Sequence, residues 1–327
     1  MNNQQTVPDF TDVKAAHARL KGRVVRTPLL RCAALDAAVG RPVFVKAECL
    51  QTTGSFKYRG ASNRIMQLAE HERAAGVVAY SSGNHAQGVA AAAAEAGVPA
   101  LIVMPKDVPA VKSDGVKARG AQIVYYDRIS ENREEIAARI AKDRGAVLVP
   151  PYEDPMVIAG QGTAGMECAE QCQEFGVEPE ALIVNAGGGG LTAGIALACE
   201  ALYPDAKLYT AEPDGFDDHK RSFAVGQKQR NTKLSGSVCD ALLTPEPGDL
   251  TFAINKRLVS AGLSASDDDV FAAMRFAFRH LKIVLEPGGA MALAIALKGL
   301  VPGNGPLCVL ATGGNVDPAL FARVITA

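Results

Sequence analysis

The segment ALIVNAGGGGLTAGIALACEA, residues 181–201, joins three patterns in the order strand, glycine loop, helix. Ala181–Asn185 is a continuous apolar run, which is typical of a strand that is buried on both faces. Leu191–Ala201 carries apolar residues at helical spacing. Between them stand four consecutive glycines, Gly187–Gly190, which would be an entropically poor choice for a simple connector. A buried strand that runs into a helix is the repeating unit of an α/β fold.

The same alternation continues along nearly the whole chain. Apolar runs predict further strands at Val43–Val45, Val77–Tyr80, Ala100–Met104, Gln122–Tyr125, Leu208–Ala211 and Leu307–Ala311. Helical patterns such as Arg133–Lys142 lie between them. We therefore predict an α/β protein with mainly parallel sheets covered on both faces, and with its ligand-binding loops at the carboxyl ends of the strands.

Length and composition limit the class of protein. The 327 residues are enough for two domains, and the proline-rich stretch Val149–Pro155 is the best candidate for a crossing between them. Lys plus Arg number 34 and Asp plus Glu 35, so the chain lacks the basic excess that a nucleic-acid partner requires. No apolar stretch approaches the ~18 residues of a membrane span, and the start does not resemble a signal peptide. With seven scattered cysteines, we expect a cytoplasmic protein without a membrane partner.

Four loops of unusual composition could carry chemistry. Gln51–Ala61 contains Lys57, Ser81–Gly88 combines hydroxyl, amide and imidazole groups, and Thr312–Asn315 offers a hydroxyl beside two glycines. Taken alone, Lys57 could be a surface charge and Ser81–Gly88 could be a helix cap. The glycine run Gly187–Gly190 favours an anion such as phosphate, because backbone N–H groups at a helix N-terminus can surround it.

The glycine run also permits a different cofactor. Residues 188–193 fit the relaxed dinucleotide pattern Gly-x-Gly-x-x-Ala, and Glu212 follows about 20 residues later, where a ribose-binding acid would lie. An NAD-dependent oxidoreductase is therefore an alternative. The pattern comes past the middle of the chain, however, and this reading leaves the other loops unexplained.

The loops together resemble one family. The chain contains the motifs GSFKYRGA at Gly54–Ala61, SSGNH at Ser81–His85, IAGQGT at Ile158–Thr163, GGGG at Gly187–Gly190 and TGGN at Thr312–Asn315. In this order they resemble the pyridoxal-phosphate enzymes of the threonine/serine dehydratase and serine racemase family (fold type II), which includes 3-hydroxyaspartate dehydratases.

The resemblance implies an architecture. It predicts a large domain of residues 1–66 and 154–327 and a small domain of residues 67–153. Both would be open α/β domains, as in the β subunit of tryptophan synthase, with the cofactor in the cleft between them. The chain would form a homodimer.

The resemblance also implies cofactor contacts. Lys57 would form the Schiff base with pyridoxal phosphate, with Phe56 against the cofactor ring. Asn84 would bind the phenolic oxygen, and Thr312 would face the pyridine nitrogen. The phosphate would be held by the backbone of Gly187, Gly188, Gly189, Gly190 and Leu191.

A substrate site and a cation site follow from the same resemblance. The substrate carboxylate would be bound by a group of residues at a helix N-terminus, namely Ser81, Ser82, Asn84 and His85. Arg133 would reach the β-hydroxyl side of the substrate. Mg²⁺, or Ca²⁺ or Mn²⁺, would be bound by Glu212, the carbonyl of Phe216, and Asp218.

The predicted reaction is β-elimination from L-threonine, L-serine or 3-hydroxyaspartate, which yields a 2-oxo acid and ammonia. Lys57 would remove the Cα proton, and the β-hydroxyl would leave as water. Racemisation of serine or an aspartate-like substrate is the alternative, because Ser82 occupies a position that can supply a second acid. β-Replacement fits the motifs less well.

Substrate choice rests on weaker signals. Arg133, with nearby Tyr126 and Arg128, could pair with a second carboxylate, which favours 3-hydroxyaspartate. Tyr58 stands where the family often has an aliphatic residue, so we expect an altered pocket at that point.

Overall fold

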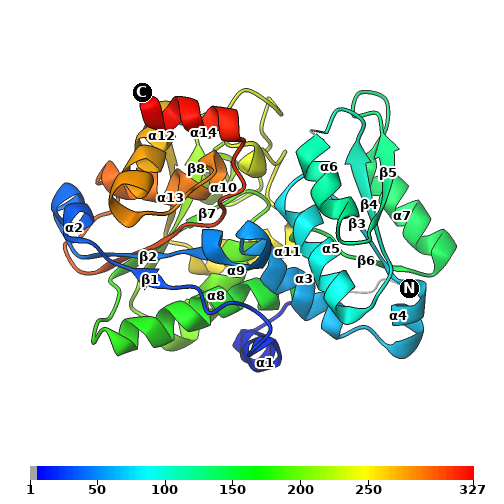
Figure 1. Cartoon of the computed structure of the whole chain (residues 1–327). Helices are drawn as coiled ribbons and strands as arrows, with labels where there is room; N and C mark the ends of the chain where they lie inside the picture. The colour runs from blue at the N-terminus through cyan, green and yellow to red at the C-terminus, as the bar shows by residue number, and fades with distance from the viewer. Residues whose placement is uncertain (1–5, 109) are drawn as a thin grey trace.

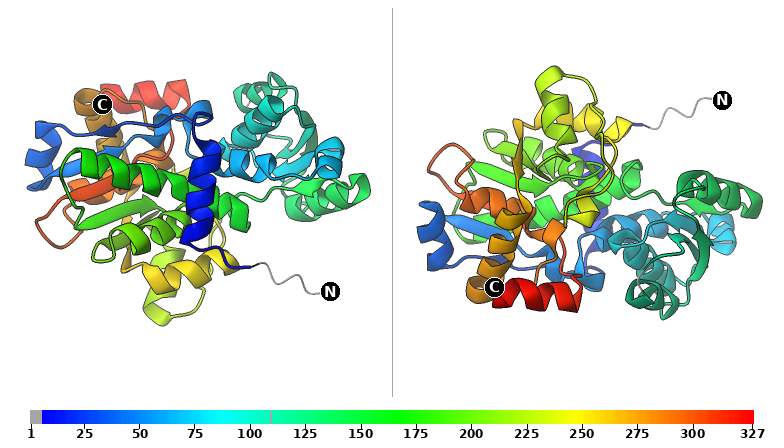
Figure 2. Two further views of the ribbon diagram at one scale, coloured as in Figure 1. Left: turned by 90° about the horizontal axis from the view of Figure 1, so that it is seen from below. Right: turned by 90° about the horizontal axis from the view of Figure 1, so that it is seen from above.

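The computed structural model describes residues 6–108 and 110–327, and it contains two separate β-sheets. The first sheet has six strands in the order β1-β2-β10-β7-β8-β9, and the second has four in the order β5-β4-β3-β6. Only the β1–β2 pair is antiparallel among the pairs described; the others are parallel. Figure 1 shows the two sheets side by side, each with helices on its faces, and Figure 2 shows the same arrangement from below and from above. The predicted α/β class with mainly parallel sheets is confirmed.

The strands are β1 (Leu29–Leu30), β2 (Val43–Lys46), β3 (Val77–Tyr80), β4 (Ala100–Pro105), β5 (Gln122–Tyr126), β6 (Val147–Leu148), β7 (Ala181–Asn185), β8 (Lys207–Pro213), β9 (Ala261–Ala265) and β10 (Leu307–Leu310). The α-helices are α1 (Phe10–Leu20), α2 (Ala33–Val39), α3 (Lys57–Met66), α4 (Glu70–Ala75), α5 (Asn84–Ala96), α6 (Ala110–Lys117), α7 (Arg133–Arg144), α8 (Pro155–Glu174), α9 (Gly190–Leu202), α10 (Asp218–Val225), α11 (Asp249–Leu258), α12 (Asp267–Phe276), α13 (Pro287–Leu297) and α14 (Pro318–Thr326).

Burial on both faces explains why the strands read as continuous apolar runs. Neighbouring residues of a strand point to opposite faces of the sheet. In β7, Ile183 packs in the cluster that contains α12 and α13, whereas Leu182 and Val184 pack with α8 and α9. In β3 of the second sheet, Ala79 packs with α5 and Val78 packs with α7. Both sheets therefore have helices on two faces, as the sequence predicted.

The predicted strands are all present, and three more occur. β1 and β6 have two residues each, so they are too short to give a pattern in the sequence. β9 has the sequence AGLSA, which is weakly apolar because this strand lies at the edge of the first sheet. Every strand of the second sheet falls within residues 77–148. The domain boundaries at residues 66/67 and 153/154 stay a prediction.

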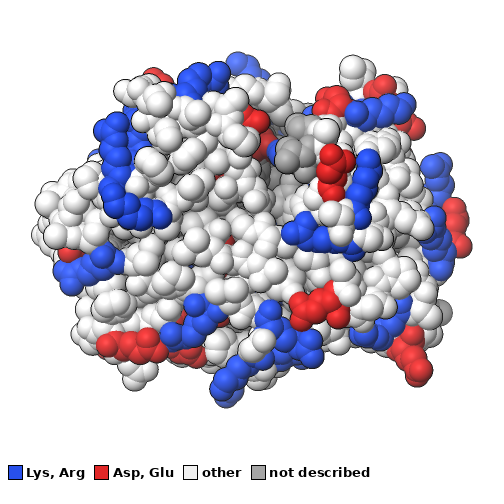
Figure 3. Space-filling view, in the orientation of Figure 1, with Lys and Arg blue, Asp and Glu red and all other residues white. Residues whose placement is uncertain are grey.

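The surface and the helices add two observations. On the face shown in Figure 3, Lys and Arg side chains are interspersed with Asp and Glu side chains. In the part of the chain that the structure describes, no helix combines the length and the apolar character needed to cross a lipid bilayer.

Candidate active site

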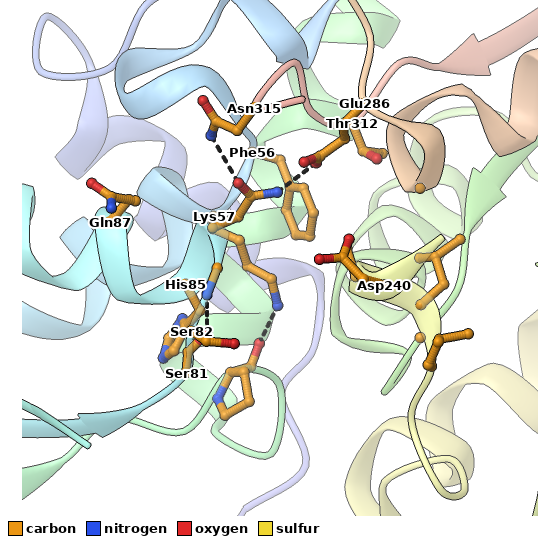
Figure 4. A pocket seen from close by; sticks show the side chains of 18 of the residues that line it. Phe56, Lys57, Ser81, Ser82, His85, Gln87, Asp240, Glu286, Thr312 and Asn315 are labelled. Atoms are coloured by element: carbon orange, nitrogen blue, oxygen red, sulfur yellow. Dashed lines mark hydrogen bonds between the residues drawn. The ribbon is translucent and has the colours of Figure 1, made fainter. Parts of the chain in front are cut away.

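A cavity of about 780 Å³ lies between the two sheets and is lined by all four of the loops singled out in the sequence. These loops follow β2, β3, β7 and β10, so the carboxyl ends of strands from both sheets meet at the cavity. Figure 4 shows Lys57 inside it, with Glu286, Thr312 and Asn315 on one side and Ser81, Ser82 and His85 on another. Parallel topology therefore brings together groups that are far apart in the chain.

Lys57 is the first residue of α3, and its amino group lies deep in the cavity. Nζ donates a hydrogen bond to the carbonyl of Pro151 at 2.8 Å (Figure 4). It also lies 5.1 Å from the centre of the Phe56 ring. Burial lowers the pKa of Lys57 to about 8, so about a tenth of the amine is neutral at pH 7 and about half at pH 8. A neutral amine is the form that attacks an aldehyde or accepts a proton.

Three residues of the glycine loop, Gly188, Gly189 and Gly190, pack too closely against their neighbours for side chains. A Cβ at Gly188 would clash with the ring of Tyr152, and a Cβ at Gly190 would lie 2.8 Å from Tyr152 Cβ. Gly189 has a φ of +92°, which disfavours any other residue. Helix α9 begins at Gly190, so its free N–H groups and the loop amides can surround an anion at the cavity wall.

Asn84 connects the second sheet to the first across the cavity. It begins α5, and its Nδ2 donates to Glu286 Oε1 at 2.5 Å. Its Oδ1 accepts from Asn315 Nδ2 at 2.8 Å. The two bonds fix the orientation of the amide, and they leave one Nδ2 hydrogen for a ligand. Burial raises the pKa of Glu286 to about 7.

Thr312 is held by a residue that the sequence analysis missed. Asn185 Nδ2 donates to Thr312 Oγ1 at 2.8 Å and also bonds the carbonyls of Gly288 and Gly289. Because its oxygen already accepts this bond, the Thr312 hydroxyl keeps its own proton for an acceptor in the cavity. A neutral hydroxyl at this place suits an unprotonated ring nitrogen.

The predicted carboxylate-binding residues all line the cavity, but the ring of His85 is already engaged. Its Nε2 lies 2.8 Å from the carbonyl of Val149, so this nitrogen must carry the proton. Burial, followed by the charge of Lys57, lowers the pKa of the imidazole to about 3, so the ring is neutral. A neutral ring with its donor in use cannot donate to a carboxylate. The N-terminus of α5 and the Ser81 and Ser82 hydroxyls remain as donors.

Arg133 lines the cavity from the start of α7. Its guanidinium lies 5.7 Å from the centre of the Tyr80 ring. Tyr126 and Arg128, which were expected to bind a carboxylate together with Arg133, lie elsewhere. Arg128 forms an exposed ion pair with Asp107 at 2.9 Å, and Tyr126 is buried in the core of the second sheet. The three-residue carboxylate site expected from the sequence is therefore wrong in two of its members.

Tyr58 also lies away from the cavity. Its ring is buried in the core of the second sheet, and its hydroxyl bonds Glu95. Successive helical residues point about 100° apart, so Lys57 and Tyr58 face different directions. The altered pocket expected at Tyr58 is not present at that residue.

The predicted cation ligands Glu212, Phe216 and Asp218 do not line the cavity. Glu212 is fully buried next to the last residue of β8, and its oxygens accept from the amides of His219 (2.7 Å) and Lys220 (2.8 Å). Asp218 Oδ1 accepts from Asn231, while its buried Oδ2 has no partner. Burial, and then the neighbouring Asp218, raise the pKa of Glu212; burial raises the pKa of Asp218 to about 7. Two buried carboxyl groups with a free oxygen fit a hard cation.

The same geometry removes the support for a dinucleotide at this loop. Glu212 would have to bind a ribose in the cavity, but it is fully buried and does not line the cavity. Its oxygens are turned to backbone amides on α10 instead.

Several functional positions gave only weak signals in the sequence. Asn185 is the one polar end of an apolar strand, and Tyr152 lies in the proline-rich stretch assigned only as a crossing. Glu286 stands before a helix that begins with proline, and His219 follows Asp218. None belongs to the four loops singled out in the sequence, so their roles depend on contacts between distant segments.

Known proteins resemble this chain over nearly its full length. It is 43% identical to the L-threo-3-hydroxyaspartate ammonia-lyase of Pseudomonas sp, over 97% of this chain and 98% of that one. It is 37% identical to the serine racemase of Arabidopsis thaliana, over 97% and 96% of the two chains. The solved structure of maize serine racemase superposes with a TM-score of 0.92 at 36% identity, covering 98% of each chain.

A family model described as "Pyridoxal-phosphate dependent enzyme" matches residues 20–313. This range includes Lys57, the glycine loop and Thr312, all of which line the cavity. The buried lysine with a lowered pKa and the glycine loop at a helix N-terminus fit an aldehyde that carries a phosphate. The resemblance inferred from the motifs is confirmed, and the chain belongs to the family of pyridoxal-phosphate-dependent enzymes.

Proposed function

We propose that this enzyme eliminates water from a β-hydroxy amino acid and releases a 2-oxo acid and ammonia. The observation that carries the proposal is the amino group of Lys57, which is buried in the cavity with its pKa lowered to about 8. The names of relatives support the same reaction class, since they include ammonia-lyases for 3-hydroxyaspartate and threonine.

The cofactor, when bound, withdraws electrons from the substrate Cα and so makes its proton removable. Lys57 is placed to hold the cofactor and then to accept that proton at Nζ. Thr312 would offer a neutral hydroxyl to the ring nitrogen, and Asn84 an amide to the phenolic oxygen. The phosphate would be bound by Gly187, Gly188, Gly189, Gly190 and Leu191, with Phe56 against the ring.

Substrate contacts would come from the start of α5 and from Arg133. Ser81, Ser82 and Asn84 would bind the α-carboxylate, aided by the partial positive charge at the helix N-terminus. Arg133 makes no ion pair with any residue that the structure describes, so its guanidinium is available to a substrate group beyond Cβ. A β-carboxylate would satisfy it best, which favours 3-hydroxyaspartate over serine and threonine.

The proposal is tested by assaying 2-oxo acid release from L-serine, L-threonine and the 3-hydroxyaspartate stereoisomers. We expect turnover of at least one of these, with the highest kcat/KM on a 3-hydroxyaspartate. Arg133→Met should lower kcat/KM for 3-hydroxyaspartate by about 10–100-fold, with a smaller effect on serine. No 2-oxo acid release from any member of the panel would refute the elimination.

Racemisation is a second candidate, because Ser82 lines the cavity beside Lys57 and could supply a proton to the opposite face of Cα. Several relatives are named serine racemase. Ser82→Ala should abolish D-isomer formation and preserve elimination if both reactions occur. If the unsubstituted enzyme forms no D-isomer, racemisation is refuted.

We also propose that Glu212, Asp218 and the carbonyl of Phe216 bind Mg²⁺ or a related cation. The observation that supports this site is the buried Asp218 Oδ2, which has no protein partner. Within the described residues, no Lys or Arg forms an ion pair with Glu212 or Asp218, whereas the adjacent Asp217 pairs with Arg221 at 3.1 Å. A cation would remove the repulsion between the two buried carboxylates.

Removal of the cation is expected to destabilise the enzyme. A ligand that binds only the folded state at a hundredfold excess over its Kd stabilises it by about 2.7 kcal/mol. Thermal unfolding in EDTA should therefore occur at a lower temperature than unfolding in excess Mg²⁺. Asp218→Asn should erase the difference, while the control Asp217→Asn should retain it. Equal unfolding temperatures of the unsubstituted enzyme in EDTA, Mg²⁺, Ca²⁺ and Mn²⁺ would eliminate the cation site.

The homodimer, the cytoplasmic location and the division into two domains are retained as predictions. Gel filtration with light scattering checks the oligomeric state, and limited proteolysis between residues 149 and 155 checks the crossing.

A further inference from the structure

The side of the glycine loop that faces away from Tyr152 is held by three polar side chains, which we call the brace: His219, Thr251 and Asn255. All three residues are fully buried. They donate to three successive loop carbonyls, namely His219 Nε2 to Gly187 (2.7 Å), Thr251 Oγ1 to Gly188 (2.6 Å) and Asn255 Nδ2 to Gly189 (3.2 Å). The sequence motifs did not include any member of the brace.

The brace converges on one point of the loop. A Cβ added at Gly189 would lie 2.8 Å from Asn255 Nδ2, 2.8 Å from His219 Cε1 and 3.0 Å from Thr251 Oγ1. Tyr152 occupies the other side, against Gly188 and Gly190. The loop is thus enclosed between a polar layer and an aromatic ring.

The direction of the carbonyls determines the direction of the amides. Each loop carbonyl shares a planar trans peptide with the N–H of the next residue, so these three carbonyls orient the amides of Gly188, Gly189 and Gly190. In the part of the chain described here, these three N–H groups donate to no backbone carbonyl. All three residues line the cavity. Since the carbonyl of each of these peptides is bonded to the brace, its amide points the opposite way and is left available to an acceptor in the cavity.

We propose that His219, Thr251 and Asn255 are positioning residues, which hold the glycine loop in the conformation that binds the cofactor phosphate. Four glycines in a row have large conformational freedom, and an unheld loop would have to lose it on binding. Fixing the carbonyls in advance reduces that loss, which is the general basis of preorganised affinity. The inference rests on the cofactor family and does not depend on which reaction the enzyme performs.

Comparing pyridoxal phosphate with pyridoxal tests the brace directly. Both compounds carry the aldehyde that reacts with Lys57, but only the first carries the phosphate. Thr251→Val keeps the shape of the side chain and removes the donor to Gly188. In the full-length apoenzyme we expect Thr251→Val to raise the Kd for pyridoxal phosphate about tenfold, because the buried Gly188 carbonyl loses its hydrogen-bond donor. The Kd for pyridoxal should change less than about twofold.

Two further variants separate positioning from a general structural effect. Thr251→Ser retains the hydroxyl and should bind pyridoxal phosphate like the unsubstituted protein. Thr210→Val makes the same chemical change at a buried threonine whose hydroxyl has no partner, and it should alter neither Kd. If Thr251→Val does not fold, Asn255→Ala provides the same comparison at the Gly189 carbonyl.

An equal loss of affinity for both compounds would overturn the proposal, because it would show a structural role without selectivity for the phosphate. An unchanged Kd for pyridoxal phosphate would also overturn it. Neither result depends on turnover, so elimination could be absent while the brace is confirmed, or present while the brace fails.

Discussion

Replacing Lys57 by alanine is expected to lower the rate of 2-oxo acid release by about 10⁴-fold or more, since both the covalent anchor and the catalytic base disappear. Among the described residues, the carbonyl of Pro151 is the only hydrogen-bond partner of Lys57 Nζ, which lies in the cavity and forms no ion pair. The unsubstituted protein should be yellow, and borohydride should fix the cofactor to Lys57 irreversibly. The variant should release its cofactor on treatment with borohydride followed by denaturation.

Lys57→Arg is the matched control for charge. It keeps a cation at the same place but cannot form the covalent link or accept the proton, so it should be as inactive as Lys57→Ala. The lowered pKa also predicts a pH dependence for cofactor uptake by the apoenzyme. The rate should rise as pH approaches about 8, where the neutral amine becomes the main form, and should then level off. A rate that still climbs steeply above pH 9 would indicate an ordinary lysine and contradict the assignment.

Replacing Arg59 by methionine is expected to destabilise the fold by about 3–5 kcal/mol, because it leaves buried carboxylates without their main partner. Arg59 is fully buried two residues after Lys57. Its guanidinium bonds both oxygens of Glu48 (2.7 and 2.8 Å) and both oxygens of Glu167 (2.8 and 2.7 Å). Lys46 completes the network with a bond to Glu167 at 2.7 Å. Thermal and urea unfolding of the holoenzyme measure the loss.

The control for Arg59 is an exposed ion pair in the same chain. Arg26 bonds Glu174 at 2.6 Å with both side chains exposed, so Arg26→Met should change stability by less than about 1 kcal/mol. Arg59→Lys keeps the charge without the bidentate geometry and should give an intermediate stability. If Arg59→Met lowers the free energy of unfolding by less than about 1 kcal/mol, Lys46 alone is sufficient to compensate the buried charges of Glu48 and Glu167.

The effect of Arg59 should also depend on pH. Burial alone would raise the pKa of Glu48, but the Arg59 guanidinium, together with Lys46 and the Thr27 hydroxyl, outweighs it and holds that pKa below its usual value. This contribution to stability is complete above the usual carboxyl pKa of about 4.3 and is lost as the pH falls through the lower pKa of the folded state. In Arg59→Met the buried Glu48 charge has lost its main partner and destabilises the fold. The difference in free energy of unfolding between the unsubstituted enzyme and Arg59→Met should therefore be largest near pH 7 and should decrease toward pH 4.

The local sequence predicted the parts of the site that depend on one short segment. Gly187–Gly190 indicated a phosphate-binding helix start, because backbone conformation and the absence of side chains are properties of the segment itself. The strands β3 and β7 were predicted with their observed bounds, since burial on both faces leaves a continuous apolar run. The motif around Lys57 identified the family through its order along the chain with the other motifs.

The tertiary structure alone decided which side chains face the cavity and which polar groups support the loops. Tyr58 and Arg128 stand near predicted site residues in the sequence, yet they point into a core and to an exposed ion pair. Conversely, Asn185 and Thr251 lie far from the motif residues they hold, and a hydrogen bond across 63 or 127 positions leaves no periodic trace in the sequence. The sequence therefore determined the segments that bind the cofactor, while packing between distant segments determined their orientation.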